Sequence, residues 1–236
     1  MPSQIETIPC KAVIFDMDGL LLDSEAISFE TYVETTARYG LTVGFDSYRQ
    51  MIGLNMIEGV NVLRDILPAK IDAAVFKAEW VARYCERLAS SVPVKPGVTK
   101  VIEQLAARNV PMAVATSSPG EKAREILNRA GLASYMIAIT GGNEVERGKP
   151  APDVYLTTIQ KLVTANGVVG VDDCVAFEDS EVGVIAARAA GLRVIQIPDL
   201  VPAVKPSSPP FHLIADTLEI GAGWLQIDAL QGGNHG

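Results

Sequence analysis

Residues 11–25 of the 236-residue chain, KAVIFDMDGLLLDSE, decide the fold. The apolar run at residues 12–15 predicts a short buried strand, and it leads directly into Asp16 and Asp18. Because side chains two residues apart in an extended segment point to the same side, we expect the two carboxylates to lie close together. One of them could then bind a cation and act as a nucleophile while the other moves a proton. The carboxyl end of a strand is where parallel α/β sheets bind ligands.

Four more apolar runs, all in the second half of the chain, predict further strands. They lie at residues 112–115, 136–140, 174–177 and 193–197. Segments with helical spacing separate them, and several of these segments end in glycine, as helices often do. They cover residues 98–110, 121–132, 152–163 and 181–192. Alternation of strand and helix predicts a Rossmann-like parallel sheet with helices on both faces.

Residues 24–91 interrupt this alternation with helical patterns and no convincing strand. We therefore predict a core domain that is split in the sequence into residues 1–23 and 92–236, with a small α-helical domain inserted between them. The segment near residues 202–210 is too rich in proline for regular structure, and the last residues, QGGNHG, are expected to form a tail.

Composition limits the kinds of partner. The formal net charge of -8 and the pI near 4.8 argue against binding to nucleic acid or to an anionic membrane by bulk charge. The N-terminal residues contain no apolar stretch long enough for a signal peptide or a membrane span, so we expect a soluble cytoplasmic protein. The three cysteines show no CxxC spacing, which gives no basis for a disulfide framework or a zinc site. His212, expected in a late loop, and His235 in the tail receive no role.

Three further elements follow strands or precede helices, in an order that suits chemistry on phosphate. Residues 116–118, Thr-Ser-Ser, join a strand to a helix, where hydroxyls and free backbone N–H groups can bind an anion. Lys149 precedes a proline-stiffened helix start, and Glu178 and Asp179 end a strand. Singly, each has an ordinary explanation: a helix cap, a solvated lysine, or acids in a first helical turn. Together with Asp16 they form a specific pattern.

These four elements resemble the four signature motifs of the haloacid dehalogenase superfamily, and the resemblance covers residues 11–199. The chain most resembles the subgroup that includes beta-phosphoglucomutase and sugar-phosphate phosphatases, and it is also similar to pseudouridine-5'-phosphatase. The resemblance implies a phosphatase with a Mg²⁺ cofactor and a small phosphorylated metabolite as substrate.

The resemblance also implies catalytic roles. Asp16 would be the nucleophile that forms an aspartyl-phosphate, and Asp18 the general acid and base. Thr116 would hydrogen-bond the transferred phosphoryl group, and Ser117 could add a backbone N–H. Lys149 would stabilise the charge of the phosphoryl group and of Asp16.

The implied metal ligands are the carboxylates of Asp16 and Asp179 and the backbone carbonyl of Asp18, with Glu178 as support. Carboxylates together with waters and a substrate oxygen suit Mg²⁺. Dehalogenation is disfavoured, because dehalogenases lack the second aspartate and have no leaving oxygen to protonate.

The helical insertion resembles the mobile cap of the subgroup, hinged near residues 23–25 and 92–96. The loop RQMIGLNMIEG, residues 49–59, carries Met51, Ile52, Leu54 and Asn55 around Gly53. These side chains either line a partly apolar site for a neutral leaving group or only pack cap helices together.

A hexose-phosphate mutase is the alternative to a phosphatase. Mutase relatives carry a histidine and an arginine in the cap where this chain has Ser28 and, by alignment, Met56. A mutase would need a basic group for a second phosphate, for which Lys77 and Arg83 are the candidates. A third hypothesis is a binding protein that has kept the fold and lost turnover, and the complete set of catalytic residues argues against it.

Overall fold

A computed structural model describes residues 7–54, 56–90, 92–166, 170–203 and 212–227, and the statements below concern these residues. Its centre is a six-stranded parallel sheet with the order β4-β3-β2-β5-β6-β7. The strands are β2 (Ala12–Phe15), β3 (Met112–Ala115), β4 (Ala138–Thr140), β5 (Cys174–Glu178), β6 (Arg193–Gln196) and β7 (His212–Ile214). The predicted α/β class and parallel sheet are confirmed.

Helices cover both faces of the sheet, because successive residues of a strand point to opposite faces. On β2, Val13 and Phe15 join an apolar cluster with α5 (Val98–Ala107), α6 (Gly120–Arg129) and α9 (Leu218–Ala222). Ala12 and Ile14 join a second cluster with α7 (Asp153–Asn166) and α8 (Glu181–Ala189). Burial on both faces explains why β2 is a continuous apolar run in the sequence.

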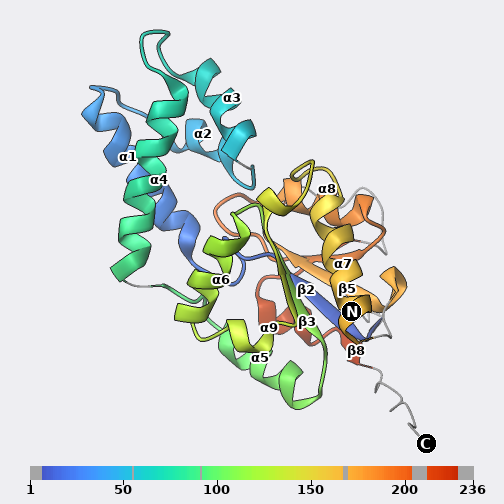
Figure 1. Ribbon diagram of the computed structural model, residues 1–236. Helices are drawn as coiled ribbons and strands as arrows, with labels where there is room; N and C mark the ends of the chain where they lie inside the picture. The colour runs from blue at the N-terminus through green and yellow to red at the C-terminus, as the bar shows by residue number, and fades with distance from the viewer. Residues whose placement is uncertain (1–6, 55, 91, 167–169, 204–211, 228–236) are drawn as a thin grey trace, which may run out of the picture.

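The helical region that interrupts the sheet consists of α1 (Ser24–Arg38), α2 (Phe45–Tyr48), α3 (Met56–Ile66) and α4 (Ala73–Ser90). It stands beyond one edge of the sheet, above α6 and α8 (Figure 1). It has its own aromatic core, in which Tyr32 packs against Trp80 with ring centroids 5.1 Å apart. The predicted helical insertion is present, and its exact limits as a domain remain a prediction.

The two segments that connect the helical region to the sheet run side by side. Leu22 and Val94 form an antiparallel bridge, and the Asp23 N–H donates to the Pro93 carbonyl at 2.8 Å. The two chain connections of the helical region therefore lie at one place, and they include the expected hinge segments.

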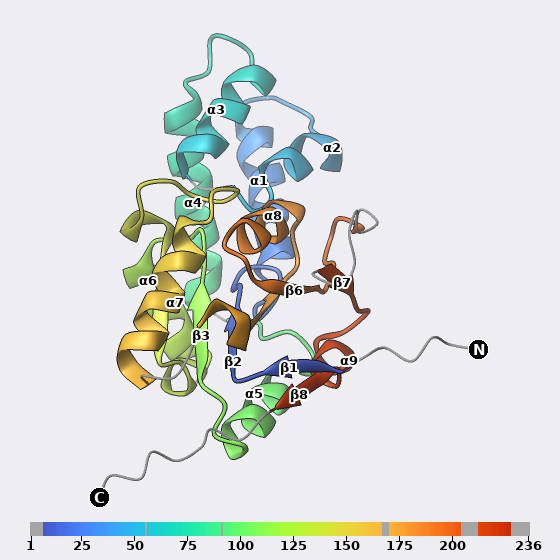
Figure 2. The same cartoon turned by 90° about the vertical axis from the view of Figure 1, so that its right-hand side faces the viewer.

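Three short strands were not predicted. β1 (Ile8–Cys10) and β8 (Leu225–Ile227) form a separate parallel pair, visible beside α9 in Figure 2, and β7 ends the main sheet. The expectation that His212 lies in a loop is wrong, because His212 begins β7 and its Nε2 lies 2.9 Å from Gln196 Oε1. Three residues are too few to show a strand period in a sequence.

Several sequence expectations fall on residues that are not described. These are Asn55, most of the proline-rich segment and the C-terminal tail with His235. Among the described helices, none is both long and apolar enough to cross a lipid bilayer.

Ile14→Ala tests the central strand. Ile14 is fully buried, whereas Ile185 on α8 is 49% exposed and provides a matched control. Ile14→Ala is expected to lower the free energy of unfolding by about 2–5 kcal/mol, because it leaves a cavity in the core. Ile185→Ala should cost less than about 1 kcal/mol. Urea unfolding measures both, and equal losses would contradict the assigned burial.

Candidate active site

The catalytic candidates gather at the carboxyl edge of the sheet because the strand ladder continues one residue beyond β2 and β3. The Asp16 N–H donates to the Phe177 carbonyl at 3.0 Å, and the Thr116 N–H donates to the Thr140 carbonyl at 3.0 Å. These bonds hold the backbones of Asp16 and Thr116 at the same edge. Both residues are buried.

Lys149 reaches this edge from the loop before α7 and is only 2% exposed. Its Nζ lies 2.5 Å from Asp16 Oδ1 and 2.5 Å from Glu178 Oε1. The Tyr155 hydroxyl donates to the same oxygen of Glu178. Burial alone would lower the pKa of Lys149, but the charges of Asp16 and Glu178 outweigh it and raise that pKa. The ammonium therefore stays charged.

Asp16, Glu178 and Asp179 form a buried group that could hold a metal ion, since each offers a carboxylate oxygen within 4.8 Å of the others. Burial, followed by the charges of Asp16 and Glu178, raises the pKa of Asp179 well above its ordinary value. Burial and Glu178 act in the same direction on Asp16, whose pKa is also raised despite the neighbouring Lys149. Three carboxyl groups face one ammonium, so a hard divalent cation fits both the oxygen donors and the excess negative charge.

The Asp18 carboxylate is outside this group and is surrounded by hydroxyls. Its Oδ1 accepts from Ser24 at 2.8 Å and from Tyr84 at 3.2 Å. Its Oδ2 accepts from Ser118 at 2.8 Å and lies 3.5 Å from the Thr116 hydroxyl. Sequence reasoning did not assign a role to Ser24 or Tyr84. Ser24 lies beside the quoted motif, while nothing in the local sequence marks Tyr84.

Two glycines let the chain approach the acids closely. Gly19 has φ +84°, and a Cβ there would lie 2.3 Å from Asp179 Oδ2. A Cβ on Gly183, in the first turn of α8, would lie 2.1 Å from the Glu178 carboxylate. Larger residues at either position would displace an acid of the buried group.

The helical region contacts the sheet edge through the loop that sequence analysis singled out. The Ser117 hydroxyl donates to the Gly53 carbonyl at 2.9 Å, and a Cβ on Gly53 would lie 3.0 Å from Ser180 Oγ. Gly53 has φ +78°, so glycine is favoured there. The Ser117 side chain thus serves the contact with the helical region.

A cavity of about 430 Å³ lies between the helical region and the sheet edge. The sheet side contributes, among others, Asp18, Ser118 and the charged Lys122 and Glu146, and the helical side contributes polar, aromatic and apolar groups. Those of the helical side include Glu25, Ser28, Tyr48, Met51, Leu54, Lys77, Trp80 and Tyr84. The candidate Lys77 therefore faces this cavity, whereas Arg83 is not among the described residues that line it.

Glu25 and Lys77 are the charged groups that the helical region contributes to the cavity wall. The Tyr48 hydroxyl donates to the Glu25 carboxylate. Burial raises the pKa of Glu25 to about 7 and lowers that of Lys77 to about 8. The Lys77 ammonium lies 3.7 Å from the centroid of the Trp80 ring. One acceptor, one donor and an aromatic face thus meet at one wall of the cavity.

The parallel sheet, the helical insertion that divides it in the sequence and the acidic group at its edge define an α/β protein with a candidate metal site, and comparison with known proteins identifies its family. Residues 13–197 match the haloacid dehalogenase-like hydrolases. The chain belongs to this family, which confirms the resemblance seen in the sequence.

Individual relatives are similar over most of their length. A "Phosphorylated carbohydrates phosphatase" of Thermotoga maritima is 34% identical over 185 residues, covering 78% of this chain and 83% of the relative. A "Probable pseudouridine-5'-phosphatase" of Drosophila melanogaster is 31% identical over 194 residues, covering 79% and 80%. The crystal structure of beta-phosphoglucomutase from Clostridium difficile superposes with a TM-score of 0.73 over 91% of this chain and 96% of that one. At 16% identity, this last similarity concerns the fold alone.

Gly19→Ala tests the close approach to Asp179. Gly40 provides a matched control, because it has φ +70° and an added Cβ would meet no atom within 4 Å. Gly40→Ala should lower the free energy of unfolding by about 1–2 kcal/mol through backbone strain alone. Gly19→Ala should cost at least about 1 kcal/mol more, because the methyl group also displaces Asp179. Urea unfolding of both variants decides the matter, and equal losses would exclude the steric contact.

Proposed function

We propose that this protein is a magnesium-dependent phosphatase that hydrolyses a small phosphorylated metabolite through an aspartyl-phosphate on Asp16. The observation that carries the proposal is the buried Lys149, whose ammonium joins Asp16 to Glu178 beside a cavity bordered by Asp18. A carboxylate held by a fixed positive charge can attack phosphorus while the charge of the phosphoryl oxygens is compensated.

In the proposed reaction, the Asp16 carboxylate forms a bond to phosphorus as the bond to the leaving oxygen breaks. The Lys149 ammonium, the Thr116 hydroxyl and the Ser117 backbone N–H would bind the phosphoryl oxygens. Phosphoryl transfer asks a protein mainly for such positioning and charge compensation. The position of these groups at one edge of the sheet supports the proposed step.

Asp18 would act as acid and then as base. It would protonate the leaving oxygen in the first step and accept a proton from the water that hydrolyses the aspartyl-phosphate. Its carboxylate is only half-buried and borders the cavity, so both a leaving group and a water can reach it.

The metal would be held by the carboxylates of Asp16 and Asp179 and by the backbone carbonyl of Asp18, with Glu178 beside them. Bound Mg²⁺ would add positive charge next to the phosphoryl oxygens. The buried oxygen donors and their excess of negative charge support this assignment.

The cavity wall supports a hydroxylated leaving group such as a sugar. The Glu25 carboxylate can accept from a hydroxyl, the Lys77 ammonium can donate to one, and the Trp80 ring lies next to them. The similarity to a phosphatase named for phosphorylated carbohydrates points the same way.

A hexose-phosphate mutase is the second candidate, because the Lys77 ammonium lies in the cavity where a second phosphate could bind. Glu25 in the same wall and Ser28 in place of the mutase histidine weigh against it. Product analysis with beta-glucose 1-phosphate separates the two, since a mutase yields glucose 6-phosphate and a phosphatase yields glucose.

Phosphate release tests the proposed reaction. With Mg²⁺, the wild type should hydrolyse a subset of a panel of phosphorylated sugars, polyols and nucleosides. EDTA should abolish the activity, and Asp16→Asn should lower kcat about a thousandfold or more, because it removes the nucleophile. If Asp16→Asn is as active as wild type, or if no substrate is turned over, the proposal fails.

Magnesium binding is tested by stability, without turnover. A ligand that binds only the folded state at a concentration 100 times its Kd raises the free energy of unfolding by about 2.7 kcal/mol. We expect urea unfolding to show such a rise for the wild type and a much smaller one for Asp179→Asn. Asp46→Asn is the control, because the Asp46 side chain is 88% exposed. An unchanged response in Asp179→Asn would refute the assigned ligand.

A further inference from the structure

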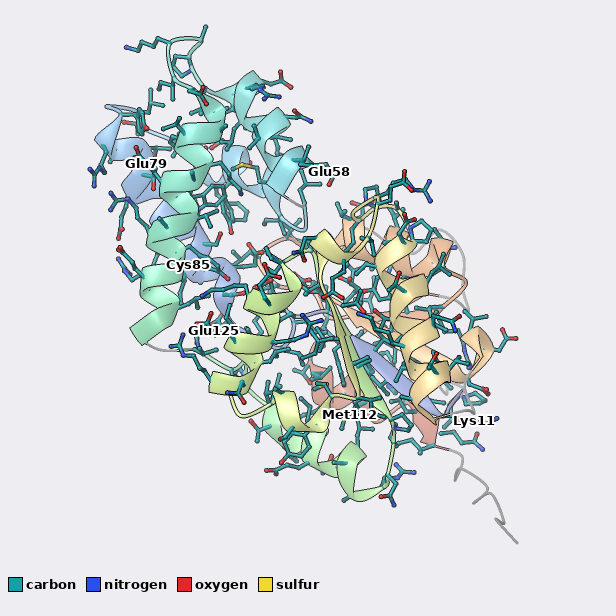
Figure 3. All side chains as sticks on the ribbon, viewed as in Figure 1. Lys11, Glu58, Glu79, Cys85, Met112 and Glu125 are labelled. Atoms are coloured by element: carbon teal, nitrogen blue, oxygen red, sulfur yellow. The ribbon has the colours of Figure 1, made fainter. Side chains whose placement is uncertain are left out.

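One hydrogen bond connects the helical region directly to the proposed acid. Tyr84 lies on α4 and its hydroxyl donates to Asp18 Oδ1 at 3.2 Å, across 66 residues of sequence. Its ring is partly buried against the apolar cluster of the sheet. Cys85, labelled in Figure 3, marks the part of α4 that carries this contact, on the side of the molecule where α4 faces α6.

The two oxygens of the Asp18 carboxylate have different surroundings. Ser24 and Tyr84 both donate to Oδ1, whereas Oδ2 faces Ser118 and Thr116 at the end of β3. Ser24 on α1 and Tyr84 on α4 thus hold Oδ1 on the side of the helical region. Oδ2 is the oxygen on the side of Thr116, where the proposed phosphoryl group would bind.

The Tyr84 hydroxyl is suited to be a permanent donor. A tyrosine hydroxyl carries its proton at neutral pH and can donate it to a carboxylate, as it does here to Asp18. The aromatic ring is also stiff, because only two torsions orient it. The helical region thus contributes a fixed O–H group to the acid.

We propose that Tyr84 is a positioning residue, whose hydroxyl holds Oδ1 of Asp18 so that Oδ2 delivers the proton to the leaving oxygen. The inference rests on the proposed phosphatase function. As Asp16 bonds to phosphorus, the electron pair of the breaking P–O bond stays on the leaving oxygen, and the proton on Asp18 Oδ2 moves to that oxygen. Asp18 is left as a carboxylate that still accepts from Ser24 and Tyr84.

The test compares two leaving groups in the Tyr84→Phe variant. The alkoxide of a sugar or polyol phosphate needs a proton to leave, whereas p-nitrophenolate leaves without one. We expect kcat/KM for the best alkyl substrate of the panel to fall about 10- to 100-fold, since general acids contribute about 10²–10⁴ and Asp18 itself remains. For p-nitrophenyl phosphate, kcat/KM should stay within about threefold, because it reports only the steps up to the first phosphoryl transfer.

Three further variants serve as references for the result with Tyr84→Phe. Asp18→Asn sets the full extent of the leaving-group selectivity, and Ser24→Ala, which removes the other donor to Oδ1, should show the same selectivity. Tyr39→Phe is the matched control, because its hydroxyl donates to Glu79 at 3.1 Å and it is not among the described residues that line the cavity. It should leave both substrates within about twofold. Thermal unfolding confirms that each variant is folded.

The outcomes separate this inference from the proposed function. If Asp18→Asn is selective between the substrates but Tyr84→Phe lowers both equally or neither, the positioning role is refuted and the phosphatase stands. If the wild type releases no phosphate, or Asp16→Asn matches it, the proposed function fails and the role of Tyr84 fails with it.

Discussion

The buried ion pair network around Lys149 is the constraint on which the rest of the structure depends. Its ammonium is 2% exposed and joins Asp16, which follows β2, to Glu178, which ends β5. Removing charges from water is costly, so such a network persists only where excellent geometry and further hydrogen bonds compensate. The sheet register, the Tyr155 hydroxyl and the close approach of Gly183 supply that geometry. The network thereby holds the charges of Lys149, Asp16 and Glu178 in fixed positions.

The sheet edge and the helical region each supply part of the candidate site. The sheet edge alone provides the acids, the lysine and the hydroxyls of residues 116–118, and these could bind a phosphoryl group. Two of the four hydroxyls around Asp18, those of Ser24 and Tyr84, and part of the cavity wall come from α1 and α4. The residues proposed for the reaction and those proposed to contact the leaving group are thus separated in the sequence and meet at Asp18.

Much of the fold could be predicted because the central strands are buried on both faces and therefore appear as apolar runs, as in β2. The edge strands β1, β7 and β8 have three residues each and carry no such signal. The location of the candidate site could be predicted from the polar residues that follow the strands, because parallel strands bring their carboxyl ends to one edge of the sheet. The contact of Tyr84 with Asp18 could not be predicted, because it depends on how α4 packs, and no local pattern encodes that packing.

The order of the strands also has a consequence for how the molecule is made. β2 is the first strand of the main sheet to be synthesised and lies in the middle of that sheet, yet its partners, β3 and β5, begin at Met112 and Cys174. During synthesis, β2 therefore has no partner strand until about half of the chain has been made, and it lacks its second partner until about three quarters has been made. Contacts so distant in sequence slow folding and leave apolar surface exposed meanwhile. The helical region, whose four helices contact one another, can form before the partner strands of β2 have been synthesised.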